Sequence, residues 1–306
     1  MKLDFAKLQG CGNDFVFVDD FSRELELTAE QVKSLCDRHF GIGADGVILV
    51  RASDDPACAA YMHYINSDGT LSEMCGNGVR CFAKYLVDRG FVPAADGRLT
   101  ADTLAGPKPI SFNTDADGML TCATVDMGQP VLEPDAIPVA SAVDATSSQG
   151  LPFVKDLTID SPWGVFSFTC VSMGNPHAVC FIDDWEDLPD DAFCDASNKR
   201  LGTFDVKSVG AFFESHDAFP AKANIEFAEV GEDAISMRVF ERGCGETLAC
   251  GTGACATSVA ASLTDRAGRK NDVELRGGTL GISWEDNGRV MMTGPAEESF
   301  HGTVEI

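Results

Sequence analysis

The sequence predicts an α/β protein built from two similar domains. Its 306 residues correspond to about two domains of roughly 150 residues each. Short segments with the alternation of β-strands outnumber the helical patterns. A glycine-rich segment that leads into an apolar helix occurs twice, which indicates an internal duplication.

Five segments have the composition and alternation of strands, and two Xaa-Gly pairs are typical of hairpin turns. The predicted strands are residues 46–50, 61–65, 165–171, 178–182 and 235–240. The predicted turns are Asp117-Gly118 and Asn287-Gly288. Short strands with close turns favour sheets over a helical bundle.

Helical patterns are few. One covers residues 28–39, where Val32, Leu35 and Cys36 fall on one face behind a Thr28 cap. Two more begin directly after the glycine-rich segments. Residues 140–150 are small and polar, so we expect a surface loop or a disordered insertion there.

The duplication follows the same order in both halves of the chain. Cys75-Gly76-Asn77-Gly78-Val79 matches Cys250-Gly251-Thr252-Gly253-Ala254. Upstream, Gly12-Asn13 and Gly174-Asn175 each precede a predicted strand. A polar residue stands nine positions before each loop cysteine, Asn66 in the first half and Glu241 in the second. The ordered set predicts two pseudo-equivalent domains.

Composition excludes several classes of function. The formal net charge of -25, from 48 acidic and 23 basic residues, repels nucleic acid and anionic membrane surfaces. No apolar window approaches the roughly 18 residues of a membrane span, and the start lacks a signal-peptide core. We therefore expect a cytoplasmic protein with neither nucleic acid nor membrane as a partner.

The 12 cysteines are too few for a disulfide scaffold, so in the cytoplasm they should be thiols. None forms a C-x-x-C pair, as a zinc ribbon or a thioredoxin site would require. Cys11 is expected to be structural. Six others lack a distinctive setting and are interpreted as small buried hydrophobic residues: Cys36, Cys58, Cys122, Cys170, Cys180 and Cys194.

Cys75 and Cys250 differ because each stands in a glycine-rich loop at the start of a predicted helix. The helix dipole and the unpaired amides should lower the pKa of such a thiol. The same amides can bind a carboxylate or phosphate, although no Gly-Lys-Ser/Thr follows as in a nucleotide-binding loop. Two such thiols facing one ligand suit the inversion of a carbon centre, with one base on each side.

Six sequence runs together resemble the diaminopimelate epimerase family over nearly the whole chain. They are Gly12-Asn13-Asp14-Phe15, Phe40-Gly41-Ile42-Gly43-Ala44-Asp45-Gly46, Met74-Cys75-Gly76-Asn77-Gly78-Val79-Arg80-Cys81, Met173-Gly174-Asn175-Pro176-His177, Glu241-Arg242-Gly243 and Ala249-Cys250-Gly251-Thr252-Gly253-Ala254. The related proline and hydroxyproline racemases share the paired cysteines, so an enzyme of that kind is an alternative. Their loops usually have His at the position of Asn77 and Pro at that of Ala249.

The resemblance implies an isomerase that converts LL-2,6-diaminopimelate to the meso form without a cofactor or metal, for lysine and peptidoglycan synthesis. It implies that Cys75 and Cys250 are the catalytic acid and base, and that His177 and Glu241 tune the two thiols. The implied substrate-binding residues are Asn13, Asn66, Gly76, Asn77, Asn175, Asn224, Glu241, Arg242, Gly251 and Thr252. Many members have Gln where this chain has Gly46, which puts a side-chain contact there in doubt.

The resemblance also implies the fold. Each domain should be a curved mixed sheet around a central helix, with the active site in the cleft between the domains. We place residues 1–124 and 295–306 in the first domain and residues 125–294 in the second. Residues 254–263 are uncharged and suit a helix enclosed on all sides. A homodimer is expected by analogy.

An alternative hypothesis, from another class of function, is a metal-binding module. Its ligands would be cysteines of the two loop regions: Cys75, Cys81, Cys244, Cys250 and Cys255. Glycine-rich loops without C-x-x-C or a nearby histidine are poor metal ligands, so this reading ranks below the enzyme.

Overall fold

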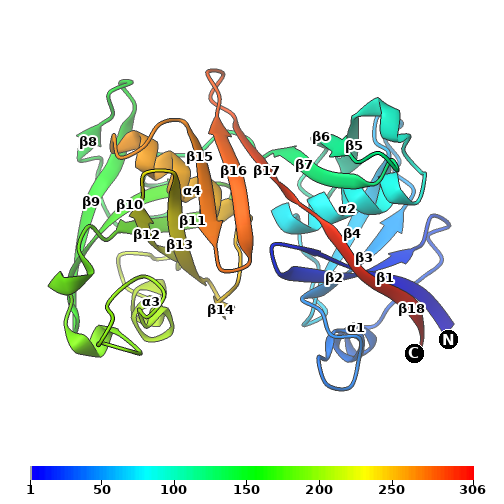
Figure 1. Ribbon diagram of the computed structural model, residues 1–306, viewed down its shortest axis with the longest axis horizontal. Helices are drawn as coiled ribbons and strands as arrows, with labels where there is room; N and C mark the ends of the chain where they lie inside the picture. Colours follow the sequence, from blue (N-terminus) through cyan, green and yellow to red (C-terminus); the bar gives the residue numbers. More distant parts are fainter. Residues whose placement is uncertain (1) are drawn as a thin grey trace. The chain divides into compact units, whose positions relative to one another are not determined.

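The computed structural model describes residues 2–306 and divides into two compact units. Unit 1 comprises Met1–Asp126 with Thr293–Ile306, and unit 2 comprises Met127–Met292 (Figure 1). The predicted domain boundaries lie two residues from these. Strand β17 (Val290–Pro295) runs across the second boundary.

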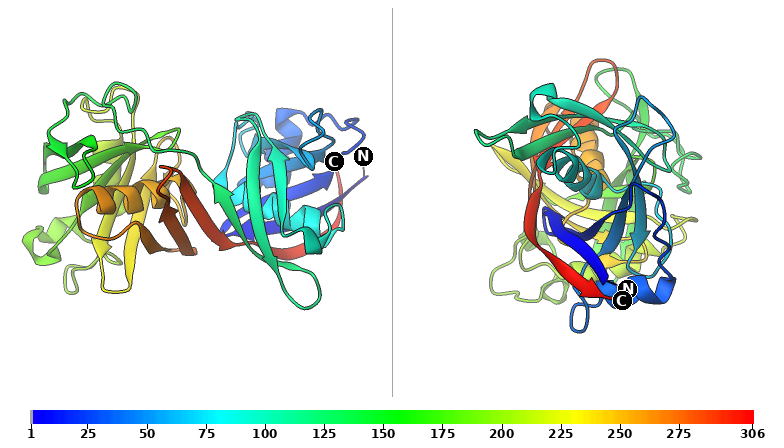
Figure 2. Two further views of the ribbon diagram at one scale, coloured as in Figure 1. Left: turned by 90° about the horizontal axis from the view of Figure 1, so that it is seen from above. Right: turned by 90° about the vertical axis from the view of Figure 1, so that its right-hand side faces the viewer.

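Unit 1 is a mixed sheet with two helices. Its elements are β1 (Lys2–Gly10), β2 (Asn13–Asp19), α1 (Ala29–Cys36), β3 (Gly46–Arg51), β4 (Ala60–Asn66), α2 (Gly76–Asp88), the 3-10 turn η1 (Ala94–Asp96), β5 (Arg98–Asp102), β6 (Lys108–Thr114), β7 (Leu120–Asp126) and β18 (Glu297–Glu305). The strands pair in the order β18–β1–β2–β3–β4–β5–β6–β7. Strand β18 lies beside β1, although most of the chain separates them in sequence (Figures 1 and 2).

Unit 2 repeats this design. Its elements are β8 (Ala145–Thr146), β9 (Pro152–Ser161), β10 (Gly164–Ser172), β11 (Pro176–Phe181), the turns η2 (Trp185–Asp187) and η3 (Asp190–Ala192), α3 (Val206–Glu214), β12 (Asn224–Val230), β13 (Ala234–Glu241), β14 (Gly245–Glu246), α4 (Gly251–Leu263), β15 (Lys270–Leu275) and β16 (Gly278–Trp284). The strands pair in the order β8–β9–β10–β11–β12–β13–β15–β16, and β14 pairs with β13.

Six strands of each unit share one topology. From β1 to β6 the successive pairs are antiparallel, parallel, antiparallel, parallel and antiparallel. From β10 to β16, with β14 left aside, the alternation is the same. Helices α1 and α3 precede the third strand, and α2 and α4 precede the fifth. The predicted duplication therefore corresponds to two units of the same fold.

The central helices α2 and α4 are enclosed. Helix α2 contacts β1, β2, β5 and β7, and α4 contacts β10, β11, β12, β13, β15 and β16. Every residue of α4 except Thr252 is buried, which confirms the enclosed helix predicted at 254–263. Its alanines, serines and glycines present little bulk, so the strands can pack around it closely.

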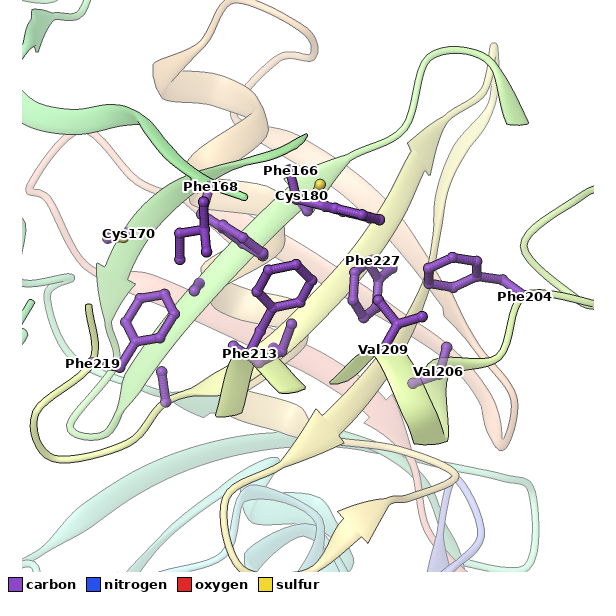
Figure 3. Packing of buried hydrophobic residues seen from close by; sticks show 14 of the residues in the cluster. Phe166, Phe168, Cys170, Cys180, Phe204, Val206, Val209, Phe213, Phe219 and Phe227 are labelled. Atoms are coloured by element: carbon purple, nitrogen blue, oxygen red, sulfur yellow. The ribbon is translucent and has the colours of Figure 1, made fainter. Parts of the chain in front are cut away.

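The other face of the unit 2 sheet packs an aromatic core (Figure 3). Phe213 of α3 contacts Phe168 of β10, with ring centroids 4.9 Å apart, and Phe204 lies 4.8 Å from Phe227 of β12. Along β12, Ile225 and Phe227 point into this core. Because strand side chains alternate, the residue between them points to the opposite face, toward α4.

The five predicted strands correspond to β3, β4, β10, β11 and β13, and no end is shifted by more than two residues. The helix predicted at 28–39 is shorter, Ala29–Cys36, and begins with the Thr28 cap. Both predicted turns are present. Within 140–150, the structure places the short strand β8 on β9, so the loop prediction was incomplete.

The prediction that six unremarkable cysteines are buried was partly wrong. Cys36, Cys170 and Cys180 are buried, but Cys58 and Cys122 are intermediate and Cys194 is exposed. Cys11 is buried in the turn between β1 and β2, in the left-handed region with φ 54°. The turn requires positive φ at both of its residues, and Gly12 supplies the second.

Candidate active site

The two loop cysteines occupy the same local position in the two units. Cys75 caps the N-terminus of α2, where its sulfur accepts from the Gly78 amide at 3.5 Å. Cys250 caps α4 in the same way, with the Gly253 amide at 3.4 Å. The predicted placement of both sulfurs at helix N-termini is confirmed.

In unit 1, Asn13 holds the Cys75 loop. Its side-chain oxygen accepts from Cys75 Sγ at 3.4 Å and from Asn77 Nδ2 at 3.3 Å. Its Nδ2 donates to Asp45 at 2.6 Å, which fixes the orientation of the amide. Asp45 was not singled out from the sequence, although it lies in the quoted Gly-Ile-Gly-Ala-Asp run.

A buried arginine lies one turn into α2. Arg80 has no exposed surface and donates to Asn77 Oδ1 at 3.0 Å, to the Gly76 carbonyl at 3.2 Å and to the Pro295 carbonyl at 3.2 Å. Sequence analysis missed this role. One signal was available, because the duplicated position in unit 2 is Cys255 and the two halves therefore differ in charge here.

Asn66 and Gly46 face each other across β3 and β4. The Asn66 amide donates to Thr70 Oγ1 at 3.1 Å. A Cβ atom on Gly46 would lie 2.5 Å from the Tyr64 ring and 2.6 Å from the Ile65 carbonyl. The structure thus has no room for a side chain at position 46, so Gly46 contributes no side-chain contact to a substrate.

In unit 2, three polar side chains form a row, of which His177 and Glu226 are buried and Asn175 is half-buried. His177 Nδ1 lies 2.6 Å from Glu226 Oε1, and both side chains have no exposed surface. His177 Nε2 lies 3.0 Å from Asn175 Oδ1. Glu226 was missed from the sequence, because within a strand it reads as one more surface position of an acidic protein.

The remaining predicted residues gather around the end of β13. Asn224 accepts from the Arg242 amide at 2.9 Å and donates to the Pro176 carbonyl at 2.9 Å. The Arg242 guanidinium donates to the Ala221 carbonyl at 3.0 Å. Glu241 accepts from Thr247 Oγ1 at 2.5 Å. The Asn224 side chain therefore links the backbone at Arg242 to that at Pro176, through its oxygen and its nitrogen respectively.

The expected lowering of the Cys250 pKa is wrong for this structure. Burial raises the pKa of the Cys250 thiol well above its usual value of 9.0, and the nearby carboxyl groups of Glu241 and Glu226 add to the shift. Bonds from Thr252 and the Gly253 amide act in the opposite direction but are weaker. Cys250 is consequently a neutral thiol at neutral pH.

The metal-binding interpretation requires several ligand side chains close together. Among residues 2–306, no three His, Cys, Asp or Glu side chains are grouped as ligands of a metal ion. Of its proposed ligands, Cys244 is exposed whereas Cys250 and Cys255 are buried. Across the same residues, no helix is both long and apolar enough to cross a membrane.

Comparison with known proteins gives a consistent family. A family model described as diaminopimelate epimerase matches residues 5–133 and 169–298. Proteins named diaminopimelate epimerase from Leptospira biflexa and Synechocystis are 42% and 45% identical, each over 100% of both chains. One from Methanococcus maripaludis is 40% identical over 99% of this chain and 100% of its own.

Solved structures share the fold at low identity. A probable proline racemase from Agrobacterium radiobacter has a TM-score of 0.67 at 15% identity, covering 99% of this chain and 93% of that one. A hydroxyproline epimerase from Agrobacterium vitis has a TM-score of 0.64 at 15% identity, covering 99% and 91%. These two similarities bear on the fold alone.

Proposed function

We propose, since the chain belongs to the diaminopimelate epimerase family, that it is an isomerase converting LL-2,6-diaminopimelate to meso-diaminopimelate. This reaction supplies a precursor of lysine and of peptidoglycan. The observation that carries the proposal is the paired placement of Cys75 and Cys250, each at the N-terminus of an enclosed helix in one of two units with the same topology.

The proposed chemistry uses the two thiols as acid and base. A thiolate takes the proton from the α-carbon, and the other thiol returns a proton to the opposite face, so the carbon is inverted and the two sulfurs exchange roles. No electron acceptor or donor is needed, and we propose that the enzyme works without cofactor or metal. The raised pKa of Cys250 keeps this thiol protonated, which supports its role as the acid that delivers a proton to the α-carbon.

The α-proton is far less acidic than a thiol, so the negative charge that develops must be stabilised. The amides at Gly76, Asn77, Gly251 and Thr252 begin α2 and α4, where the helix dipole favours an anion. We propose that they bind the α-carboxylate of the substrate.

The substrate carries two ammonium and two carboxylate groups, which require both acceptors and donors. We propose that these come from the polar side chains of both units: Asn13, Asn66, Asn175, Asn224, Glu241 and Arg242. His177 and Glu241 are proposed to tune the two thiols. The racemase alternative is not favoured, because Asn77 stands where racemases usually have histidine and is 2% exposed, donating to Asn13.

We further propose a homodimer in the cytoplasm with the small-molecule substrate as its only other partner. Light scattering of the purified protein gives the mass in solution. A mass close to the 32.6 kDa of one chain would contradict the dimer.

Epimerisation in D2O tests the function. Incubation with LL-diaminopimelate should yield meso product carrying one solvent deuterium at the inverted carbon, since thiol protons exchange with water. Cys75→Ala and Cys250→Ala should each lower turnover about 100-fold or more, because each removes an acid or base. Proton NMR and mass spectrometry of the product give both readouts.

Cys194→Ala serves as the control, because Cys194 is exposed and distant in sequence from either loop. It should retain the activity of the unaltered protein. Near-normal turnover by Cys250→Ala would refute the two-thiol mechanism. Activity that is lost on dialysis against EDTA and restored by a divalent ion would refute the metal-free one.

A further inference from the structure

One pair of equivalent buried positions is apolar in unit 1 and polar in unit 2. In unit 1 the positions are Phe15 of β2 and Ile48 of β3, and in unit 2 they are His177 of β11 and Glu226 of β12. The strand registers establish the match, because Phe15 pairs with Gly46 and His177 pairs with Asn224. Ile48 and Glu226 each follow that partner by two residues.

Both pairs lie under the first turn of a central helix. A Cβ atom on Gly78 would lie 3.4 Å from Phe15 and from Ile48, and one on Gly253 would lie 2.9 Å from Glu226 Oε1. The unit 1 pair shows that this fold packs well with two apolar side chains here. A buried histidine and glutamate at the same place are therefore not required for folding, and they cost desolvation.

The contacts place one proton of the unit 2 pair, the one on His177 Nε2. The Asn175 side-chain oxygen can only accept, so His177 Nε2 donates to it. His177 Nδ1 then faces Glu226 Oε1 at 2.6 Å. Among the described residues, Glu226 Oε2 has no hydrogen-bond partner. A bare carboxylate with an unpaired oxygen is costly in the interior. Burial raises the pKa of Glu226, which favours the protonated carboxyl group, and the hydrogen bond to His177 acts in the opposite direction but is weaker.

We propose that Glu226 is a positioning residue for the reaction. As a neutral acid it donates to His177 Nδ1, which holds the imidazole neutral with its proton on Nε2. That proton in turn holds Asn175 by its carbonyl oxygen, so the Asn175 amide nitrogen is presented to a carboxylate of the substrate. The inference rests on the proposed function, and it adds a residue that acts on substrate only through two others.

Of the groups around Glu226, the carboxyl group of Glu241 favours the neutral acid, whereas a charged His177 would favour the carboxylate. His177 faces it from β11, Glu241 from the end of β13 and Cys250 from the start of α4. An ionised Glu226 would add negative charge beside a thiol that must itself become a thiolate during turnover. A neutral one avoids that repulsion and still supplies the hydrogen bond.

Substitutions that separate charge from hydrogen bonding test the proposal. Glu226→Gln keeps a neutral donor of the same length, so kcat/KM should stay within about threefold of the unaltered enzyme. Glu226→Ile places the unit 1 residue in unit 2 and should lower kcat/KM about 10-fold or more, mainly through KM, because Asn175 is no longer held. Glu229→Gln is the control, since Glu229 lies on the same strand but bonds to Trp185.

The double variant His177→Phe with Glu226→Ile recreates the whole unit 1 pair. Its denaturation midpoint should equal or exceed that of the unaltered protein, because it replaces a buried polar pair by apolar side chains. Its activity should nevertheless be lost. A fall in stability together with activity would assign the pair to folding and overturn the proposal.

Nitrogen-15 NMR of the histidines gives a readout that does not depend on turnover. His177 should be neutral with the proton on Nε2 in the unaltered protein and in Glu226→Gln, and a mixture of tautomers in Glu226→Ile. In an Asn175→Ala background, Glu226→Ile should have little further effect on kcat/KM. A charged His177 imidazole in the NMR spectrum would overturn the inference. So would equal losses of kcat/KM in Glu226→Gln and Glu226→Ile, or losses in Asn175→Ala and Glu226→Ile that simply add in the double variant.

The two levels of proposal fail differently. If the unaltered protein does not epimerise diaminopimelate, the proposed function is wrong, whatever the tautomer. If it does and Glu226→Ile matches its kcat/KM, only the role of Glu226 is wrong.

Discussion

At the scale of single residues, the protonation of Cys250 can be read from its reaction with iodoacetamide. Only the thiolate reacts, and the pKa of Cys250 lies well above 9.0, so alkylation should be slow at pH 7–8. The rate should rise about tenfold for each pH unit. The exposed Cys194 should be modified first. Peptide mapping by mass spectrometry follows both sites.

Glu241→Gln provides the comparison for this prediction. It removes a carboxylate that raises the pKa of Cys250 while leaving the burial unchanged, so the alkylation rate at a given pH should increase. Rapid modification of Cys250 at pH 7 in the unaltered protein would show that the helix dipole, rather than burial, sets its pKa.

Residue types and spacing predicted the two caps but not their electrostatics. A cysteine before Gly-x-Gly and an apolar run indicates a helix N-terminus, and the dipole of that helix follows directly. Burial and the approach of Glu241 and Glu226 depend on which strands pack beside α4, and spacing does not contain that information. For this reason the direction of the Cys250 pKa was wrong and Glu226 was overlooked.

At the scale of the element, the first turns of α2 and α4 should respond differently to the same change. A Cβ atom on Gly253 would come within 2.9 Å of Glu226 and 3.2 Å of Cys250 Cβ, whereas one on Gly78 meets its neighbours at 3.4 Å. Gly253→Ala should therefore displace the sulfur and lower kcat/KM about 10-fold or more. Gly78→Ala should have a small effect, since alanine also favours the helix.

Measuring kcat/KM of Gly253→Ala and Gly78→Ala under the same conditions tests this difference. Equal losses would mean that the glycines serve only the approach of substrate to the backbone, and that packing beneath the helix is unimportant.

Periodicity predicted most strands and the enclosed helix because these depend on local patterns. The two-residue strand β8 was not predicted, since a pairing that short arises from its neighbour β9 rather than from its own composition. The pairing order of the strands was not predicted, because the periodicity of a segment does not say which strand lies beside it. The repeated alternation of parallel and antiparallel pairs became visible only in the registers.

At the scale of the whole molecule, stability should fall in alkaline solution. Burial raises the pKa of Cys36 to about 11 and those of Cys81 and Cys180 to about 12, and it raises those of Cys170 and Cys250 as well. Above pH 9 the unfolded chain releases these protons while the folded protein keeps them. The free energy of unfolding therefore decreases with pH from about 9 upward, by about 1.4 kcal/mol per pH unit for each thiol.

Urea denaturation between pH 8 and 10.5 under reducing conditions measures this slope. Cys170→Ala should make the slope shallower, whatever it does to stability at pH 8, because alanine has no proton to release. Cys194→Ala should leave the slope unchanged, since that side chain is exposed. A stability that stays constant up to pH 10.5 would contradict the raised pKa values.

The pairing of β18 with β1 has a consequence for how the chain is made. Synthesis proceeds from the N-terminus, so β1 leaves the ribosome long before its neighbour exists, and all of unit 2 is translated in between. During that interval β1 has β2 on one side and an open edge on the other. Unit 2, whose residues are continuous, can close first, and the N-terminal unit becomes complete only when the last strand arrives.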